Sequence, residues 1–375
     1  MNYQGYLIYR IRIQRHWSQA ELCKGICTVS YLSKIETGKA EPSEDILRLL
    51  LERLGLKSDK AIEAEAVELA DQSWEALFEG RFAKLNALLK DIELKRYEAV
   101  PAWLDLALLT SRKPLETALE SCMDTRQLAL QRILQGQEAE AVRLLPDAYT
   151  YLMLGIAEYK TGNYSAAIDA LQVAYDFASR EGKVRIMLKA KLYLGNTYCN
   201  LQDLPNMERH YCVGQRLAED LQDEGALQAI GYNTASAWIE IGRYEDAYAW
   251  FSKQPHTLMI LHKLAICCEK TGRREEALQA LKQAEIMDDD QTESSLAGQL
   301  LQLVRYRLDH PDYLAREDYG SLLLDTFMQL RKNMPAGYAI FHLPWVLEWY
   351  KAKRQYKKAC ELMEEFPNKL PLAIS

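Results

Sequence analysis

The chain has 375 residues, of which 49% are hydrophobic and 26% are charged, and its formal net charge is −7 at pH 7. These proportions are ordinary for a soluble globular protein with room for two or more domains. No apolar run reaches the ~20 residues that a membrane-spanning helix needs, and the N-terminus has no signal-peptide pattern. We therefore expect a cytoplasmic protein with no membrane partner, whose eight cysteines are reduced thiols.

The charge is unevenly distributed along the chain. Residues 1–60 contain 10 Lys and Arg against 7 Asp and Glu, a net charge of +3. Residues 61–375 contain 36 against 46, a net charge of −10. A basic segment joined to an acidic remainder indicates that nucleic acid binds to the first segment alone. We predict two domains: residues 1–60, called the head, and residues 61–375, called the body.

The head begins with two predicted helices. The first covers residues 4–15 and offers apolar side chains to a core at Leu7, Ile8, Ile11 and Ile13. Ser18 is suited to N-cap the second helix, because Glu21 three residues later completes a capping box. Gln19 then lies in the first turn, where a helix-turn-helix protein touches the DNA backbone.

The third predicted helix begins near Thr28 and ends at Gly38. Its apolar residues, expected to face the core, are Val29, Leu32 and Ile35. Its polar residues, expected nearer the major groove of DNA, are Ser30, Tyr31, Ser33 and Lys34. Pro42-Ser43 open a fourth helix, which we expect to pack through Ile46, Leu47, Leu49, Leu50 and Leu54.

Over about residues 5–57 the head resembles the lambda-repressor/Cro-like (XRE) helix-turn-helix family. The residues that carry the resemblance are Gln19-x-x-Leu22, Tyr31-Leu32-Ser33-Lys34-Ile35-Glu36-x-Gly38-Lys39 and Pro42-Ser43. The resemblance implies that Gln19 touches phosphate or base, that Thr28 to Tyr31 read bases, and that Glu36 is structural. The predicted DNA-binding residues are Gln19, Thr28, Val29, Ser30, Tyr31, Ser33, Lys34 and Lys39. The alternative is a helical head that never meets DNA or that contacts only protein.

The body repeats one phrase, a turn glycine followed by an aromatic residue and then an alanine. The clear copies are Gly162-x-Tyr164-x-x-Ala167, Gly242-x-Tyr244-x-x-Ala247 and Gly272-x-Arg274-x-x-Ala277, with weaker ones at Gly80-x-Phe82, Gly136-x-Glu138-x-x-Ala141 and Arg354-x-Tyr356-x-x-Ala359. Gln202 holds the turn position between the first two clear copies. The pattern resembles the tetratricopeptide repeat, a helix–turn–helix unit of about 34 residues. The resemblance implies an all-α chain, in which the head is followed by a right-handed solenoid with a concave inner wall, built of longer helices where the spacing is longer.

Polar side chains recur on one face of the first helix of successive repeats. The predicted peptide-binding residues are Lys160, Lys189, Tyr193, Asn196, Asn200, Tyr232, Asn233, Ser236, Glu240, His262 and Lys263. An asparagine amide both donates and accepts, which matches the backbone of an extended peptide. The alternative is that these asparagines cap or bridge neighbouring helices.

The head and body together resemble the peptide-pheromone receptors of the Rgg/Rap/NprR/PlcR/PrgX group, and the segment from Gly25 to Glu36 looks closest to the NprR and PlcR branch. The resemblance implies a homodimeric transcription factor, switched by a short imported signalling peptide, that binds double-stranded operator DNA. It also implies that Asn196, Asn200 and Asn233 grip the peptide backbone. The alternative is a body that binds another protein, such as a phosphorelay component, with DNA binding secondary.

An enzyme is not expected, because the sequence has no glycine-rich phosphate loop, His-Glu-x-x-His motif or nucleophile elbow. We predict no cofactor and no metal. Asp288-Asp289-Asp290 is interpreted as a solvated loop, and the basic residues from Lys351 to Lys358 as a solvated face.

Overall fold

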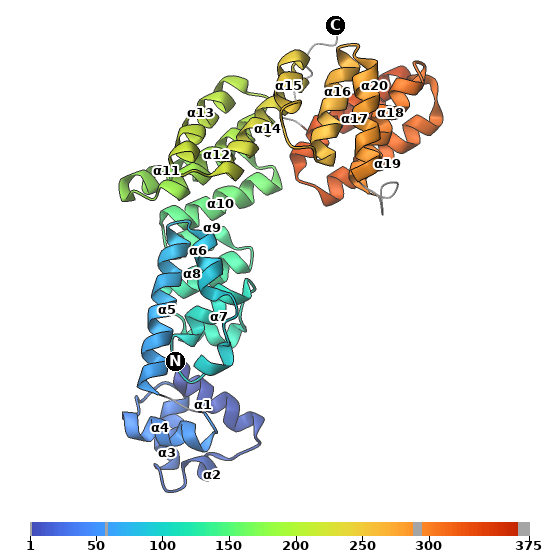
Figure 1. Cartoon of the computed structure of the whole chain (residues 1–375). Coiled ribbons are helices and arrows are strands. Elements are labelled where there is room, and N and C mark those ends of the chain that lie inside the picture. Colours follow the sequence, from blue (N-terminus) through green and yellow to red (C-terminus); the bar gives the residue numbers. More distant parts are fainter. Residues whose placement is uncertain (1, 57–58, 288–294, 367–375) are drawn as a thin grey trace. The chain divides into compact units, whose positions relative to one another are not determined.

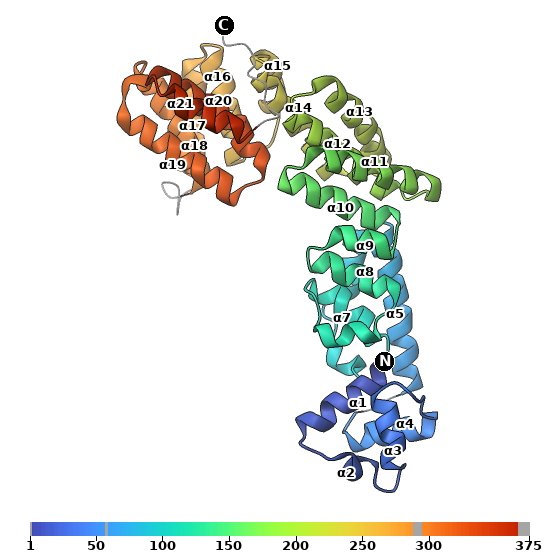
Figure 2. The same ribbon diagram turned by 180° about the vertical axis from the view of Figure 1, so that it is seen from behind.

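The computed structural model describes residues 2–56, 59–287 and 295–366, and within these ranges every regular element is helical (Figures 1 and 2). The predicted all-α fold class is therefore confirmed. Asp288-Asp289-Asp290 lie outside the described residues. No helix in the described ranges combines the length and hydropathy that crossing a bilayer requires.

The helices follow one another with short connections. In chain order they are α1 (Tyr3–Gln14), α2 (Gln19–Cys23), α3 (Val29–Glu36), α4 (Glu44–Arg53), α5 (Lys60–Phe78), α6 (Phe82–Leu89), η1 (Leu94–Tyr97), α7 (Trp103–Ser111), η2 (Thr117–Cys122), α8 (Thr125–Leu134), α9 (Glu138–Leu144), α10 (Ala148–Thr161), α11 (Tyr164–Glu181), α12 (Val184–Asn200), α13 (Leu204–Asp220), α14 (Glu224–Glu240), α15 (Tyr244–Phe251), α16 (Leu258–Lys270), α17 (Arg274–Met287), α18 (Leu296–Asp309), η3 (Tyr313–Ala315), α19 (Glu317–Asn333), α20 (Ala336–Ala352) and α21 (Tyr356–Glu364).

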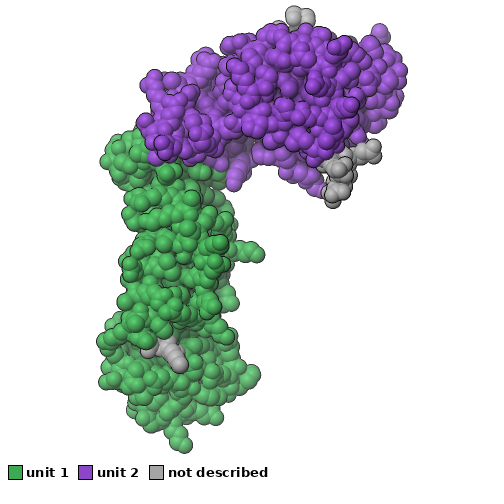
Figure 3. Space-filling model, in the orientation of Figure 1, with its two compact units in different colours: residues 1–157, 169–190 green, residues 158–168, 191–375 purple. Residues whose placement is uncertain are grey.

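The chain divides into two units (Figure 3). The first unit contains residues 1–157 and 169–190, and the second contains residues 158–168 and 191–375. The head belongs to the first unit, which also holds the helices from α5 to α9.

Local capping fixes the helices of the head. Ser18 caps α2 in a complete capping box, in which its Oγ accepts from the Glu21 N–H at 3.1 Å and its own N–H donates to the Glu21 carboxylate at 2.6 Å. Thr28 caps α3 with a single bond, accepting from the Tyr31 N–H at 3.2 Å. The core beneath these helices includes Leu7, Ile8, Leu22, Leu32, Ile35 and Leu50, all fully buried.

Three apolar residues that were expected in this core lie at the surface. Val29 is 44% exposed, Ile13 is 48% exposed and Leu49 is 38% exposed. Val29 is the first residue of α3, where the chain has just left its cap and no helix covers it. On α4 the fully buried residues are Leu50, as expected, and Leu51, which the sequence pattern did not single out.

A buried ion pair crosses the head. The Arg12 guanidinium donates to both carboxylate oxygens of Glu36, at 2.6 Å and 2.8 Å, and Gln19 Nε2 donates to the same carboxylate at 2.8 Å. Arg12 and Glu36 are both less than a tenth exposed. Glu36 therefore ties α1, α2 and α3 together, which is the structural role that the resemblance implied.

The core of the head continues into the helices that follow α6. Leu104 and Leu119 belong to the same hydrophobic cluster as Leu7 and Leu32. The Tyr3 hydroxyl donates to the Glu98 carbonyl at 2.8 Å, and Arg10 pairs with the Glu98 carboxylate at 2.6 Å. The Tyr3 and Trp103 rings stack at 5.4 Å. Helix α1 thus contacts both the other helices of the head and residues 98–119.

Left-handed turns join the helices of the body at the predicted positions. Gly162 and Gly242 have φ of 83° and 81°, and Gln202 and Arg354 adopt φ of 59° and 54° at their equivalent positions. A non-glycine residue reaches this region only at some cost, so the turn is imposed by the packing of the helices that flank it. The four helices from α11 to α14 are 17 or 18 residues long, in agreement with the longer spacing there.

Small residues let paired helices approach closely. A Cβ at Gly195 on α12 would overlap the ring of Tyr211 on α13, and a Cβ at Gly231 on α14 would lie 2.5 Å from the Trp250 ring. The alanines of the repeated phrase are fully buried at Ala167, Ala247 and Ala277. These contacts position α12 and α14, which carry most of the polar residues discussed next.

Candidate functional sites: an exposed helix and an asparagine pocket

The outer face of α3 and its flanking turns carries the predicted DNA-binding residues. Five of them are exposed at Thr28, Val29, Ser30, Lys34 and Lys39, and three are half-buried at Gln19, Tyr31 and Ser33. A short helix with small and basic side chains on its open face has the form that enters a major groove.

Some of these side chains already have partners within the head. Gln19 donates to Glu36, and the Tyr31 hydroxyl donates to the Glu41 carbonyl at 3.0 Å. The Thr28 hydroxyl accepts the capping bond of α3. Their geometry is therefore set before any ligand binds.

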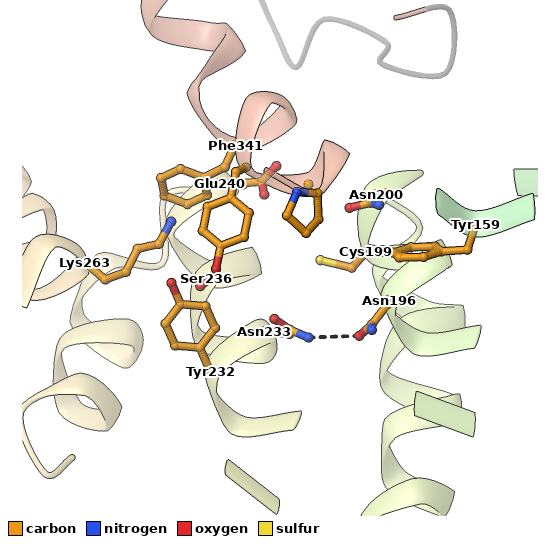
Figure 4. A pocket seen from close by; sticks show the side chains of 13 residues that line it. Tyr159, Asn196, Cys199, Asn200, Tyr232, Asn233, Ser236, Glu240, Lys263 and Phe341 are labelled. Carbon is orange, nitrogen blue, oxygen red and sulfur yellow. Dashed lines mark hydrogen bonds between the residues drawn. The ribbon is translucent and has the colours of Figure 1, made fainter. Parts of the chain in front are cut away.

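The second unit contains a pocket of about 110 Å³, called here the asparagine pocket (Figure 4). One wall comes from α10, α12, α14 and α16, and the other comes from the start of α20 and the residue before it. Its lining residues are Tyr159, Asn196, Cys199, Asn200, Tyr232, Asn233, Ser236, Glu240, Lys263, Pro335, Gly337, Tyr338 and Phe341.

The three asparagines hydrogen-bond to neighbouring side chains. Asn233 Nδ2 donates to Asn196 Oδ1 at 2.9 Å, and the Tyr211 hydroxyl donates to the same oxygen at 2.6 Å. Asn200 Nδ2 donates to the Tyr164 hydroxyl at 3.2 Å. Asn196 and Asn233 thus bridge α12 to α14, as the alternative interpretation of these residues expected. Each amide has four hydrogen-bonding sites, so these bonds leave further donors and acceptors at the pocket wall.

Two hydroxyl groups in the pocket wall, one helical turn apart, lie within hydrogen-bonding reach of each other and have no other partner in the described part of the chain. They are Tyr232 Oη and Ser236 Oγ, both buried within α14. A hydroxyl both donates and accepts, so this pair keeps further hydrogen-bonding capacity at the pocket wall.

A buried lysine closes one side of the pocket. Lys263 is 3% exposed, and its Nζ lies 2.7 Å from the centroid of the Phe341 ring. Burial lowers the pKa of Lys263 well below its usual value, and the charge of Glu240 opposes that shift. Glu240 also accepts a bond from Gln202 Nε2 at 3.2 Å. The pocket therefore presents one amine and one carboxylate beside neutral amides and hydroxyls.

Seven of the eleven predicted peptide-binding residues line this pocket: Asn196, Asn200, Tyr232, Asn233, Ser236, Glu240 and Lys263. Four do not. Lys160 is exposed outside it, and the Tyr193 ring packs against Tyr159 at 5.5 Å. His262 is fully buried and stacks on His342 at 5.4 Å. Lys189 lies in the first unit, with its Nζ 5.2 Å from the centroid of the Phe82 ring.

The residues that the sequence did not predict are mainly those of α20. Tyr338, Phe341 and Gly337 come from the segment between the Gly272 and Arg354 copies of the repeated phrase, so no spacing pointed to them. Tyr159 and Cys199 are different, because each is the chain neighbour of a predicted residue. In the described ranges no group of three or more His, Cys, Asp or Glu side chains is arranged to hold a metal ion.

Comparison with known proteins identifies the head. Residues 8–60 match the helix-turn-helix family model, so this segment is a helix-turn-helix domain. No curated protein matches the sequence significantly.

Most of the chain is similar in fold to a solved structure. A Rap protein complexed with Competence and Sporulation Factor is 13% identical, with a TM-score of 0.56, covering 81% of this chain and 97% of that one. This likeness supports a helical repeat-like body after the head. PlcR of Bacillus thuringiensis, in complex with a peptide and DNA, is 18% identical, with a TM-score of 0.32 over 77% of this chain and 95% of that one. ComR of Streptococcus vestibularis, in its apo form, is 15% identical, with a TM-score of 0.29 over 74% and 98%. At those two TM-scores the superpositions support no conclusion about this chain.

Proposed function

We propose that this chain is a cytoplasmic transcription regulator whose head binds operator DNA and whose asparagine pocket binds a short signalling peptide that switches the head. The observation that carries the proposal is the pairing, in one chain, of a helix-turn-helix domain with a pocket lined by asparagine amides and buried hydroxyls. The helix-turn-helix domain would bind the DNA, and the pocket would bind the ligand that controls it.

Peptide is the ligand class that the pocket chemistry favours. The amides of Asn196 and Asn233 and the hydroxyls of Tyr232 and Ser236 offer donors and acceptors in alternation, as a peptide backbone does. The pocket is smaller than the 300–1,000 Å³ typical of a ligand site, so it holds only part of a peptide. The Rap protein of similar fold was solved with Competence and Sporulation Factor, which supports a ligand on this fold.

The switch is proposed to act by population shift. A peptide that binds one arrangement of the body more tightly than another biases the chain toward that arrangement. In a homodimer on a palindromic operator, the two α3 helices must enter major grooves about one helical turn, ~34 Å, apart. A small change in the body is then enough to move the two heads into or out of that spacing.

A groove that binds a whole partner protein is less favoured. A helix of a partner needs a wide apolar groove, whereas the asparagine pocket is about 110 Å³ and is lined mostly by polar and tyrosine side chains.

The hydroxyl of Ser236 gives the sharpest test. A heptapeptide selected from a random library on the intact protein is titrated by calorimetry against wild type and against Ser236→Ala. We expect Ser236→Ala to weaken peptide binding about tenfold, because it removes one hydroxyl from the pocket wall.

Ser179→Ala is the matched control, because that serine lies on α11 in the first unit and bonds to the Asp176 carbonyl. Unchanged peptide affinity in Ser236→Ala would contradict the site. A library that yields no binder at all would contradict peptide as the ligand.

A further inference from the structure

The exposed isopropyl group of Val29 is the feature of the head that the proposed function leaves unexplained. Val29 is the first residue of α3 and is 44% exposed. A single exposed apolar side chain is ordinary on a protein surface. Its position is not ordinary, because the N-terminal residues of the second helix of a helix-turn-helix contact base edges.

The polar neighbours of Val29 are already committed to bonds within the head. Gln19 donates to Glu36, the Thr28 hydroxyl accepts from the Tyr31 N–H, and the Tyr31 hydroxyl donates to the Glu41 carbonyl. These bonds fix where the three side chains point. Val29 and Ser30 are the exposed residues at the start of α3 whose side chains are not held by such a bond.

The chemistry of Val29 limits what it recognises. An isopropyl group neither donates nor accepts a hydrogen bond, so it gains nothing from a phosphate oxygen or from the polar edges of guanine, adenine or cytosine. In the major groove, thymine alone among the four bases presents an apolar group, the C5-methyl. Placing Val29 opposite a polar edge instead would desolvate that edge without replacing its hydrogen bonds to water.

We propose that Val29 reads a thymine through its C5-methyl group, and so fixes one thymine in each half-site of the operator. This inference rests on the proposed binding of DNA by the head. It goes beyond that proposal by naming the base and the chemical group that this side chain recognises. Lys34 and Lys39, which are exposed and make no ion pair in the described ranges, supply contacts of a different kind, to phosphates or to guanine.

The test measures the contribution of the thymine C5-methyl group to binding while the rest of the duplex stays unchanged. The full-length protein is first used to select binding duplexes from a random pool. In the selected duplex each thymine is then replaced in turn by deoxyuridine, which differs from thymidine only in lacking the methyl group, and the dissociation constant is measured by gel shift.

For wild type we expect one position in each half-site at which deoxyuridine weakens binding about fourfold, the effect of removing one buried methyl group. For Val29→Ala we expect weaker binding to the thymine duplex and no further loss with deoxyuridine at that position. Alanine is a better helix former than valine, so the variant is expected to fold, which circular dichroism checks.

Ile13→Ala is the matched control, because Ile13 is equally exposed, at 48%, but lies on α1. It should retain the wild-type sensitivity to deoxyuridine. A wild-type protein that is insensitive to deoxyuridine at every position, or a Val29→Ala variant as sensitive as wild type, would overturn the assignment of Val29 alone. A pool from which no duplex is enriched would overturn the proposed DNA binding and this inference with it.

Discussion

Gly195 on α12 is predicted to be irreplaceable even by alanine. A Cβ at this position would lie 2.9 Å from Cζ of Tyr211 and closer still to two neighbouring ring carbons, whereas carbon atoms in contact are ordinarily 3.5–4.0 Å apart. Tyr211 is 3% exposed and its hydroxyl donates to Asn196, so the ring has no space into which it can move.

The net effect follows from two opposing contributions. Alanine in the interior of a helix is favoured over glycine by about 1 kcal/mol. Overpacking a buried ring costs about 1–3 kcal/mol, and breaking the bond from Tyr211 to Asn196 adds about 1 kcal/mol. We therefore expect Gly195→Ala to lower the free energy of unfolding by about 1–3 kcal/mol.

Gly214 on α13 provides the matched comparison. It is also inside a helix and buried, but a Cβ there would meet its nearest neighbour, Cδ1 of Ile230, at an ordinary 3.5 Å. Gly214→Ala should stabilise the protein by up to about 1 kcal/mol, because only the helix preference changes.

The assay is thermal unfolding followed by circular dichroism, with hydrogen exchange of the amides in α12 and α13 to locate the effect. A Gly195→Ala variant at least as stable as wild type would refute the argument, because it would mean that α12 and α13 can move apart without a loss of stability. Because Asn196 is the next residue, the same variant should also weaken peptide binding in the calorimetric assay.

Two further predictions concern buried charge. Glu36→Gln should lower the free energy of opening of the head by about 3 kcal/mol, because the Arg12 guanidinium is left buried without its counter-charge. Hydrogen exchange of the amides in α2 and α3 measures this free energy of opening. An Arg12→Met/Glu36→Met double variant should recover most of the lost stability. A double variant as unstable as Glu36→Gln would argue against the ion pair as the cause. Burial lowers the pKa of His210 to about 4, so between about pH 6.5 and pH 4 the unfolded state binds a proton that the folded state does not, and stability should fall as the pH falls through that window. His210→Phe keeps a ring stacked on Tyr198 and removes the titrating group. When the midpoint of urea unfolding is measured against pH, this variant should depend less on pH between about pH 6.5 and pH 4 than wild type does. An equal dependence in both proteins would mean that other groups cause it.

The parts of the fold that follow from local chemistry could be predicted from the sequence. The capping box of Ser18 and Glu21 acts over three residues, and the turn at Gln202 follows from the spacing of the repeated phrase. The burial of individual side chains was harder. Val29 fits the helical period of a buried face, but it is the first residue of α3, where no neighbouring helix covers it.

The candidate site was predictable on one wall only. Asn196, Asn233 and Ser236 lie on helices whose register the repeats define, so their shared face could be read from their spacing. Tyr338 and Phe341 are a hundred residues further along the chain, and only the folding of the second unit brings α20 to the pocket. Nothing local to those residues signals that contact.

The continuity of the head core with residues 98–119 has a consequence for protein engineering. Helix-turn-helix segments are attractive as exchangeable cassettes, but Leu104 and Leu119 complete the interior of this one, and Glu98 holds both Tyr3 and Arg10. A graft cut after Leu54 would leave those partners behind and expose apolar surface on both pieces. The transferable part of this chain is therefore the head together with the segment through Cys122, and chimeras with new DNA specificity are better made by exchanging side chains on α3 than by exchanging the domain.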